Sequence, residues 1–256
     1  MNSEHLDIKR VAELKSAIPR QGRRIELTAP CKACPVQRAA AAAALDAADI
    51  DHLRSIASSV TLTAGQVLFS EGERADYLYS VTLGTLRLCK LMADGRRQIT
   101  GFLFPGDFLG LADNESYAYS AEAVTGCTLL RYPFARLRQL MAAYPELEHK
   151  LCAIARHELA EAQDQILLLG RKTARERVAS FLLQMLERAT RRGLDGGRIA
   201  VPMTREDMGD YLGMATETIS RILTEFRNEG MISSENAKDL MLKRPDALQR
   251  IAEGLR

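Results

Sequence analysis

Two cysteines near the N-terminus, Cys31 and Cys34, have the spacing of a metal-binding pair. Thiolates at this spacing can hold part of an iron–sulfur cluster, although such a cluster usually takes four cysteine ligands. The same spacing also fits an exposed redox-sensitive pair, or two surface cysteines without a role. The pair therefore leaves three interpretations open: a cluster, a thiol-based or dimer-bridging role, and no sensing role.

A second group of polar residues, Glu217, Ser220 and Arg221, has the spacing that places side chains on one face of a helix. Arginine can donate two hydrogen bonds to guanine, glutamate can accept one from the amino group of cytosine, and serine can serve a base or a phosphate. The alternative is a solvated salt bridge between Glu217 and Arg221. The surrounding elements decide between these interpretations.

These three residues lie in the second of two predicted helices. Thr204 is predicted to cap a first helix that runs to about Leu212, with Asp207 completing a capping box, and Gly213 ends it. A second helix is predicted to begin at Thr216. Its inward-facing residues are Ile219, Ile222, Leu223 and Phe226. Two helices joined by a glycine-containing turn are typical of a helix-turn-helix, which favours DNA reading.

The rest of the chain divides by its hydrophobic periodicity. Residues 61–133 alternate apolar and polar residues in short runs between glycines, and Asp94-Gly95 is a strong hairpin signal, so we expect an antiparallel β-roll or jelly roll. An alanine run continuing to residue 56 favours a helix capped by Asp46 or Asp49. The predicted α+β organisation is an N-terminal arm with the cysteine pair and a helix start (1–44), a β-roll (45–143), a dimerisation helix (144–170) and a winged helix-turn-helix (171–256).

The predicted long helix carries two apolar stripes. Leu147, Leu151 and Ile154 are positioned to rest on the β-roll. The second stripe has the alternating three- and four-residue spacing of a two-stranded coiled coil and consists of Cys152, Ala155, Leu159, Ala162, Ile166 and Leu169. We expect this seam to join two copies of the chain; packing within one copy is the alternative.

Composition limits the possible classes of protein. The 256 residues are 46% hydrophobic and 27% charged, no apolar run is long enough to span a membrane, and the N-terminus lacks the layout of a secretory signal, so we expect a cytoplasmic globular protein. The net charge of +2 does not decide for or against DNA binding. No nucleophile, base and orienting group converge, so the sequence does not predict an enzyme.

The order of elements and four motifs resemble the CRP/FNR superfamily of bacterial transcription regulators, above all its FNR- and FixK-like branch. The resemblance covers residues 31 to about 245 and rests on DGRRQITGF (94–102), PGDFLGL (105–111), QDQILLLGRK (163–172) and MTREDMGDYLGMATETISR (203–221). It implies that Glu217, Ser220 and Arg221 read bases, and we add Thr218 and Thr204 as predicted DNA contacts.

The resemblance further implies a homodimer bound to a palindrome similar to TTGAT-N4-ATCAA. RNA polymerase is the second implied partner, at exposed loops around residues 105–116 and 191–197. The implied function is transcription regulation, mainly activation, in anaerobic, microaerobic or nitrogen-related programmes. A non-DNA-binding interaction protein and a haem-dependent nitric-oxide-sensing regulator of the same fold are the alternatives.

The effector does not follow from the sequence. The cyclic AMP branch holds its ligand's phosphate with an arginine–serine pair, but the corresponding region, residues 108–124, contains no arginine, which disfavours cyclic AMP. An FNR-like [4Fe–4S] cluster implies a third N-terminal cysteine, where this chain has its alanine run. It also implies a fourth ligand at Leu130, three residues after Cys127. We interpret Cys89 and Cys152 as packed thiols.

Ala162 gives a further hypothesis about regulation. An FNR-like switch can carry charge at this seam position, whereas a small apolar residue removes repulsion across the two-fold axis. We therefore expect a dimer that forms without any ligand, as in FixK-type regulators whose activity follows their abundance.

Overall fold

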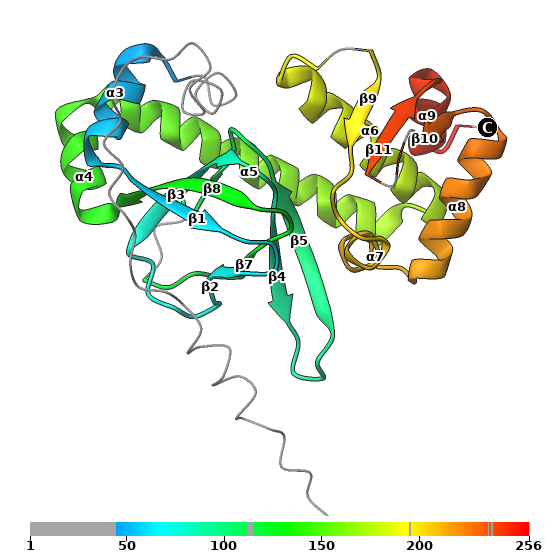
Figure 1. Cartoon of the computed structure of the whole chain (residues 1–256), viewed down its shortest axis with the longest axis horizontal. Coiled ribbons are helices and arrows are strands. Elements are labelled where there is room, and N and C mark those ends of the chain that lie inside the picture. The colour runs from blue at the N-terminus through cyan, green and yellow to red at the C-terminus, as the bar shows by residue number, and fades with distance from the viewer. Residues whose placement is uncertain (1–44, 112–114, 195, 235, 237, 256) are drawn as a thin grey trace, which may run out of the picture.

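The computed structural model describes residues 45–111, 115–194, 196–234, 236 and 238–255 (Figure 1). The predicted arm, including Cys31 and Cys34, lies outside the described residues. In the described part, no helix is both long and apolar enough to cross a membrane.

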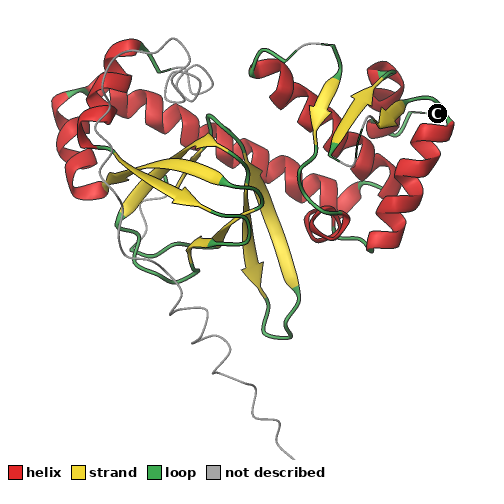
Figure 2. Cartoon of the chain, viewed as in Figure 1, coloured by secondary structure: helices red, strands yellow, loops and turns green. Residues whose placement is uncertain are grey.

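A β-roll of two facing antiparallel sheets forms the first unit, as expected from the alternating pattern (Figure 2). The first sheet has the order β1-β8-β3-β6 and the second β2-β7-β4-β5. Their bounds are β1 (Ser58–Leu62), β2 (Val67–Phe69), β3 (Tyr77–Leu83), β4 (Leu86–Leu91), β5 (Arg97–Leu103), β6 (Phe108–Leu109), β7 (Ser120–Ala123) and β8 (Cys127–Pro133).

The predicted Asp94-Gly95 hairpin joins β4 and β5. Met92 N donates to Arg96 O over 2.8 Å, and Gly95 has φ +85°, a conformation that glycine adopts at little cost. This hairpin matters below because both of its strands carry arginines that reach the DNA-binding domain.

Two helices precede the long helix in the chain. The first, α3 (Ala47–Ile56), begins at a reciprocal capping box between Asp46 and Asp49, the two residues considered as its cap. The helix start that we predicted within residues 1–44 lies outside the described residues. The second, α4 (Phe134–Ala143), was not predicted as an element, because its residues were counted with the β-roll. It ends before Pro145, whose ring cannot continue a helix and which occupies the first turn of the next one.

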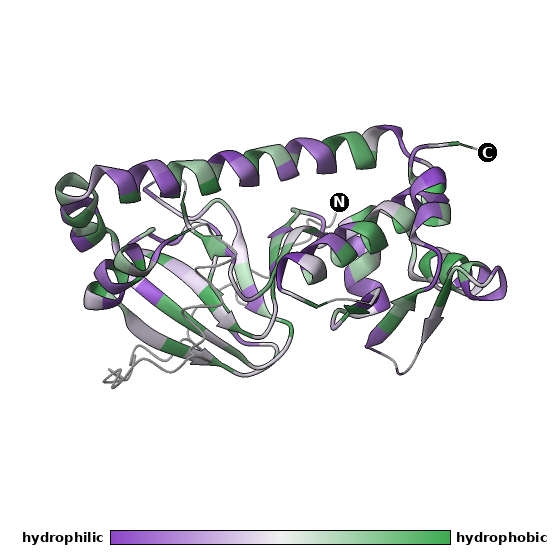
Figure 3. Ribbon diagram, turned by 90° about the horizontal axis from the view of Figure 1, so that it is seen from above, coloured by the Kyte–Doolittle hydropathy of each residue, from purple (hydrophilic) through white to green (hydrophobic). Residues whose placement is uncertain are grey.

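The long helix α5 (Pro145–Arg171) has 27 residues and runs along one edge of the molecule (Figure 3). Leu147 and Leu151 are buried in a core shared with the roll, which confirms that the first stripe rests on the β-roll. Among the described elements, none covers the opposite side of α5 (Figure 3).

The C-terminal unit combines helices with a small sheet. Its elements are α6 (Ala174–Arg191), β9 (Arg198–Ala200), α7 (Arg205–Leu212), α8 (Thr216–Asn228), β10 (Ile232–Ser234), β11 (Asp239–Leu242) and α9 (Pro245–Ala252). The sheet has the order β10-β11-β9; β9 precedes the helix pair α7–α8 in the chain, and β10 and β11 follow the pair as a wing. One continuous apolar core joins this unit to the roll through Ile99, Phe102 and Phe104.

Candidate DNA-binding site

The turn between α7 and α8 follows from local sequence. Thr204 Oγ1 accepts from Asp207 N and the Asp207 carboxylate accepts from Thr204 N, which confirms the predicted capping box. Gly213 ends α7 with φ +64°, the left-handed conformation expected of a glycine cap. Gly209 allows close packing within the pair, because a Cβ there would lie 2.6 Å from Met214 O.

Helix α8 separates apolar and polar residues onto opposite faces. Ile219, Ile222, Leu223 and Phe226 are buried, as predicted. Glu217, Ser220 and Arg221 are exposed together on the outer face, and the Arg221 side chain is 72% exposed. These three side chains could therefore reach base edges if α8 entered the major groove of DNA.

The local partners of these residues are weak. Arg221 Nε lies 3.9 Å from a carboxylate oxygen of Glu225, and within the described residues no ion pair joins it to Glu217. The salt bridge between Glu217 and Arg221 that we considered as the alternative is thus not formed. Ser220 Oγ donates to Thr216 O over 3.0 Å, a bond that a serine hydroxyl can retain while accepting another.

The two further predicted DNA contacts differ in position. Thr218, the third residue of α8, is half-buried. Thr204 is exposed, but its hydroxyl is already engaged in the helix cap. Thr204 therefore positions α7 directly, whatever contact it makes with DNA.

The carboxylate of Asp207 also joins the helix-turn-helix to the β-roll. Arg87 Nη1 of β4 donates to it over 2.6 Å and Arg97 Nη2 of β5 over 3.0 Å. Arg87 additionally pairs with Glu122, and Arg97 with Asp210. Sequence reasoning found Asp207 only as a cap and missed both arginines, because charged strand residues give no local sign of a partner more than a hundred residues away.

Aromatic packing supports the same contact between the two units. Phe102 of β5 lies against Phe181 of α6 and Tyr211 of α7, with ring centroids 6.5 and 5.3 Å away. Gln165 of α5 donates to Tyr211 O over 2.8 Å. The orientation of the α7–α8 pair is therefore set by the roll, α5 and α6 together.

Most of the predicted α5 seam is exposed in the single chain. Leu159 is 60% and Ile166 70% exposed, and Cys152 and Ala162 are exposed as well. Leu169, at the C-terminal end of the seam, is partly buried against the DNA-binding unit. Packing within one chain, the alternative considered above, thus does not cover the central residues of the seam.

The cysteines of the described part do not fit a cluster. Cys127 is buried and its thiol donates to the carbonyls of Thr85 and Thr125 over 3.2 Å, and burial raises the pKa of this thiol and that of Cys89. Within the described residues no group of three or more histidine, cysteine or acidic side chains is arranged to hold a metal.

The interior of the β-roll is filled by aromatic side chains. Phe69 and Tyr117 stack at 3.7 Å between ring centroids, and Tyr79 lies beside them. Tyr117 Oη donates to Tyr77 O over 2.8 Å, and burial raises the pKa of Tyr117 well above its usual range. The stretch that would supply the cyclic AMP phosphate partners thus contributes aromatic packing to the core.

Two family models match the chain in the order of its units. The cyclic nucleotide-binding domain matches residues 59–144, and the Crp-like helix-turn-helix domain matches residues 176–251. The first match agrees with the β-roll and the second with the segment from α6 to α9.

Curated relatives match nearly the whole length. The nitrogen fixation regulation protein FixK of Bradyrhizobium diazoefficiens is 36% identical over 79% of this chain and 86% of its own. The transcriptional activator protein Anr of Pseudomonas protegens is 34% identical over 88% of this chain and 93% of its own. These relatives are transcription regulators, not enzymes.

The solved structure of FixK2 from Bradyrhizobium japonicum is similar in fold, with a TM-score of 0.73 and 37% identity over 77% of this chain and 97% of that one. The roll, the long helix and the helix-turn-helix described here therefore have a known precedent as one architecture. On these grounds the chain belongs to the CRP/FNR family of transcription regulators and is similar to its FixK- and FNR-type members.

Proposed function

We propose that this protein binds, as a homodimer, a DNA palindrome similar to TTGAT-N4-ATCAA and activates transcription there. The observation that carries the proposal is the joint exposure of Glu217, Ser220 and Arg221 on α8. An exposed arginine and glutamate one turn apart suit a G·C pair, because arginine donates to guanine and glutamate accepts from cytosine. Each half-site of the palindrome offers such a pair.

The exposed seam of α5 supports the dimer. Leu159 and Ile166 are large apolar side chains left in solvent on a helix whose other side is packed. Pairing two such seams about a two-fold axis removes this surface from water and places two α8 helices on one DNA duplex. For half-sites in successive major grooves, the helices must lie about 34 Å apart.

We further propose that dimerisation needs no effector. Ala162, at the centre of the seam, is small and uncharged, so two copies meet without like-charge repulsion. Activity would then follow the amount of protein. The relatives named above for nitrogen fixation and for transcriptional activation support a role in nitrogen-related or low-oxygen gene expression.

The DNA site is tested by fluorescence anisotropy with the labelled palindrome and a scrambled duplex. Arg221→Ala is expected to weaken palindrome binding about 5- to 150-fold, equivalent to about 1 to 3 kcal/mol, with little effect on the scrambled duplex. The matched control, Arg250→Ala, removes the same charge from an exposed position on α9 and should leave both affinities almost unchanged. Unaltered sequence preference in Arg221→Ala would refute the assignment.

Activation is tested separately by transcription in vitro with purified bacterial RNA polymerase and a promoter that carries the palindrome. The protein is expected to increase transcript yield, and replacing the palindrome by the scrambled sequence should abolish the increase. A decrease in transcript on the intact promoter would instead make the protein a repressor at this site.

A further inference from the structure

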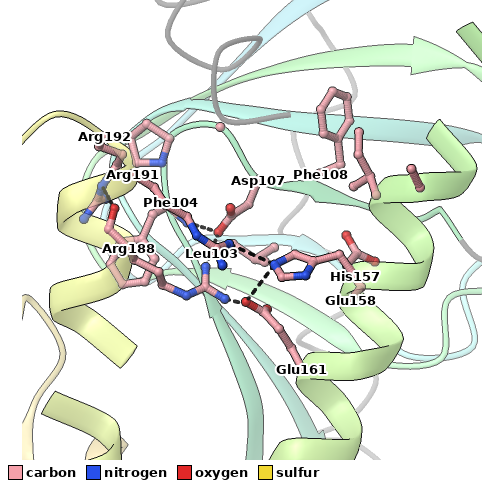
Figure 4. Close-up of a pocket in the computed structure, with 14 residues that line it drawn as sticks. Leu103, Phe104, Asp107, Phe108, His157, Glu158, Glu161, Arg188, Arg191 and Arg192 are labelled. Atoms are coloured by element: carbon pink, nitrogen blue, oxygen red, sulfur yellow. Dashed lines mark hydrogen bonds and ion pairs between the residues drawn. The ribbon is translucent and has the colours of Figure 1, made fainter. Parts of the chain in front are cut away.

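A cavity of about 250 Å³ lies where the β-roll, the long helix and the DNA-binding unit meet. The loop between β5 and β6 forms one wall, α5 a second, and the C-terminal end of α6 a third. Figure 4 shows arginines of α6 on one side of this cavity and His157, Glu158 and Glu161 of α5 on the other. Its lining overlaps the loops around residues 105–116 and 191–197 that the resemblance assigns to RNA polymerase, but no small-molecule site has been proposed there.

Most charges around the cavity already have partners. Arg188 donates to Asp107 over 2.8 Å and to Glu161 over 2.6 Å, and these contacts satisfy both carboxylates. Arg191 is half-exposed and donates to Glu187 over 2.6 Å while also contacting His157. The terminal nitrogens of Arg188 and Arg191 would therefore have to give up existing partners to bind a new anion.

Arg192 differs from its neighbours. Its guanidinium lies over the Phe104 ring, 5.0 Å from the centroid, and its Nε donates to Arg188 O over 3.1 Å. The two terminal nitrogens have no acceptor among the described residues. Burial lowers the pKa of this guanidinium, and the nearby Arg188 adds to that effect. Donors that are partly desolvated and unpaired favour an incoming acceptor.

A second donor at the same place lacks an acceptor. Arg188 Nε is buried and makes no hydrogen bond within the described part of the chain. The guanidinium of Arg188 also lies near the Phe104 ring, 5.7 Å from its centroid. Unused N–H groups of both arginines therefore lie near one aromatic side chain at the wall of the cavity.

We propose that this cavity binds a small organic carboxylate with a compact apolar body. Arg192 would hold the carboxylate through its planar fork, and Phe104, Phe108 and Ile154 would cover the apolar part. A monoanion suits the site better than a phosphate dianion, because Asp107 and Glu161 stand nearby and repel additional negative charge.

Such a ligand would touch all three units at once. It would therefore favour the observed arrangement of the DNA-binding unit against the roll, and any effect of the ligand on DNA affinity would be matched by an equal effect of DNA on ligand affinity. This inference goes beyond the proposed DNA site, and ligand binding is measured without DNA, so either proposal can fail alone.

The test is isothermal titration of the full chain with cyclohexanecarboxylate, and with the uncharged cyclohexanecarboxamide as the matched probe. The carboxylate is expected to bind saturably and at least tenfold more tightly than the amide. Arg192→Met, which keeps the apolar stem, should lose at least tenfold in carboxylate affinity, and Arg192→Lys should retain part of it. Arg191→Met, one residue away, should bind like the unaltered protein.

Three results would overturn the site. The first is no saturation by about 10 mM carboxylate, a concentration at which even a weak small ligand should saturate. The others are equal affinity for carboxylate and amide, and unchanged carboxylate affinity in Arg192→Met. Circular dichroism and thermal unfolding of each variant establish that it is folded. If Arg192→Met is unfolded, the comparison of the two probes on the unaltered protein and on Arg192→Lys decides the question.

Discussion

Arg87 and Asp207 form an ion pair between the β-roll and the first helix of the helix-turn-helix, with 2.6 Å between Nη1 and Oδ1. The Asp207 side chain is 2% exposed and also accepts from Arg97 and from the backbone of Thr204. One carboxylate thus caps α7 and ties it to both strands of the β4–β5 hairpin. A buried residue of α7 thus helps to hold the helix-turn-helix in place against the roll.

Replacing Asp207 by alanine is expected to destabilise the protein by about 3 kcal/mol. Removing one member of a buried ion pair costs about 3 to 5 kcal/mol, and the lower end applies because Glu122 and Asp210 remain as partners of the arginines. Asp210→Ala, whose carboxylate is more exposed, should cost less than about 1 kcal/mol. Urea unfolding followed by circular dichroism measures both, and equal losses would contradict this interpretation.

Gly209 and Gly170 are expected to respond to alanine with opposite signs. A Cβ at Gly209 would meet Met214 O at 2.6 Å, so Gly209→Ala must shift the turn and should cost about 1 to 3 kcal/mol. At Gly170, the next-to-last residue of α5, no atom of another element lies within 4 Å of the added Cβ, so alanine should stabilise the helix by up to about 0.5 kcal/mol. Thermal unfolding of the two variants checks this. A stabilised Gly209→Ala would show that the turn is less tightly packed than described.

Leu159→Glu is expected to convert the dimer into a monomer at micromolar concentration. In the proposed dimer, the glutamate carboxylates of the two copies would face each other across the two-fold axis, where the parent protein places two leucine side chains. Ala160→Glu introduces the same charge at the adjacent exposed position, outside the seam, and should leave the dimer intact. Sedimentation equilibrium without metal measures both. A monomeric parent protein would refute both the dimer and the role of Ala162.

The helix-turn-helix could be predicted residue by residue because its signals are local. The cap at Thr204, the left-handed Gly213 and the buried face of α8 each lie within a few residues of the feature that they determine. The strands of the roll followed in the same way from short alternating runs between glycines.

The contacts between units could not be predicted in this way. Arg97 and Asp207 are 110 residues apart, and nothing near either of them indicates the other. The predicted start of the long helix at residue 144 agrees with Pro145 as the first residue of α5, but the separate helix α4 was not predicted, because residues 134–143 were counted with the β-roll. Arg192 lies at a helix end that sequence alone would place in solvent, and only the fold brings Phe104 beneath it.

Glu158 makes the stability of the protein dependent on pH. Burial, and then the charges of Asp107 and Glu161, raise the pKa of its carboxyl from 4.5 to about 8. Between these values the folded chain keeps a proton that the unfolded chain releases, so the free energy of unfolding falls as pH rises through this window. Below pH 4.5 both states are protonated and Glu158 contributes no slope.

In Glu158→Gln, the free energy of unfolding is therefore expected to fall less steeply as pH rises. The variant should be more stable than the parent at pH 8.5 and differ little from it at pH 5. Each pKa unit corresponds to about 1.4 kcal/mol, so the gain should reach the order of a few kcal/mol. Glu148→Gln, exposed on the same helix, is the control and should follow the parent curve. Urea unfolding at pH 5, 7 and 8.5 measures all three proteins. Parallel curves for Glu158→Gln and the parent would mean that Glu158 is ionised in the folded chain at neutral pH, and that solvent reaches it from the cavity.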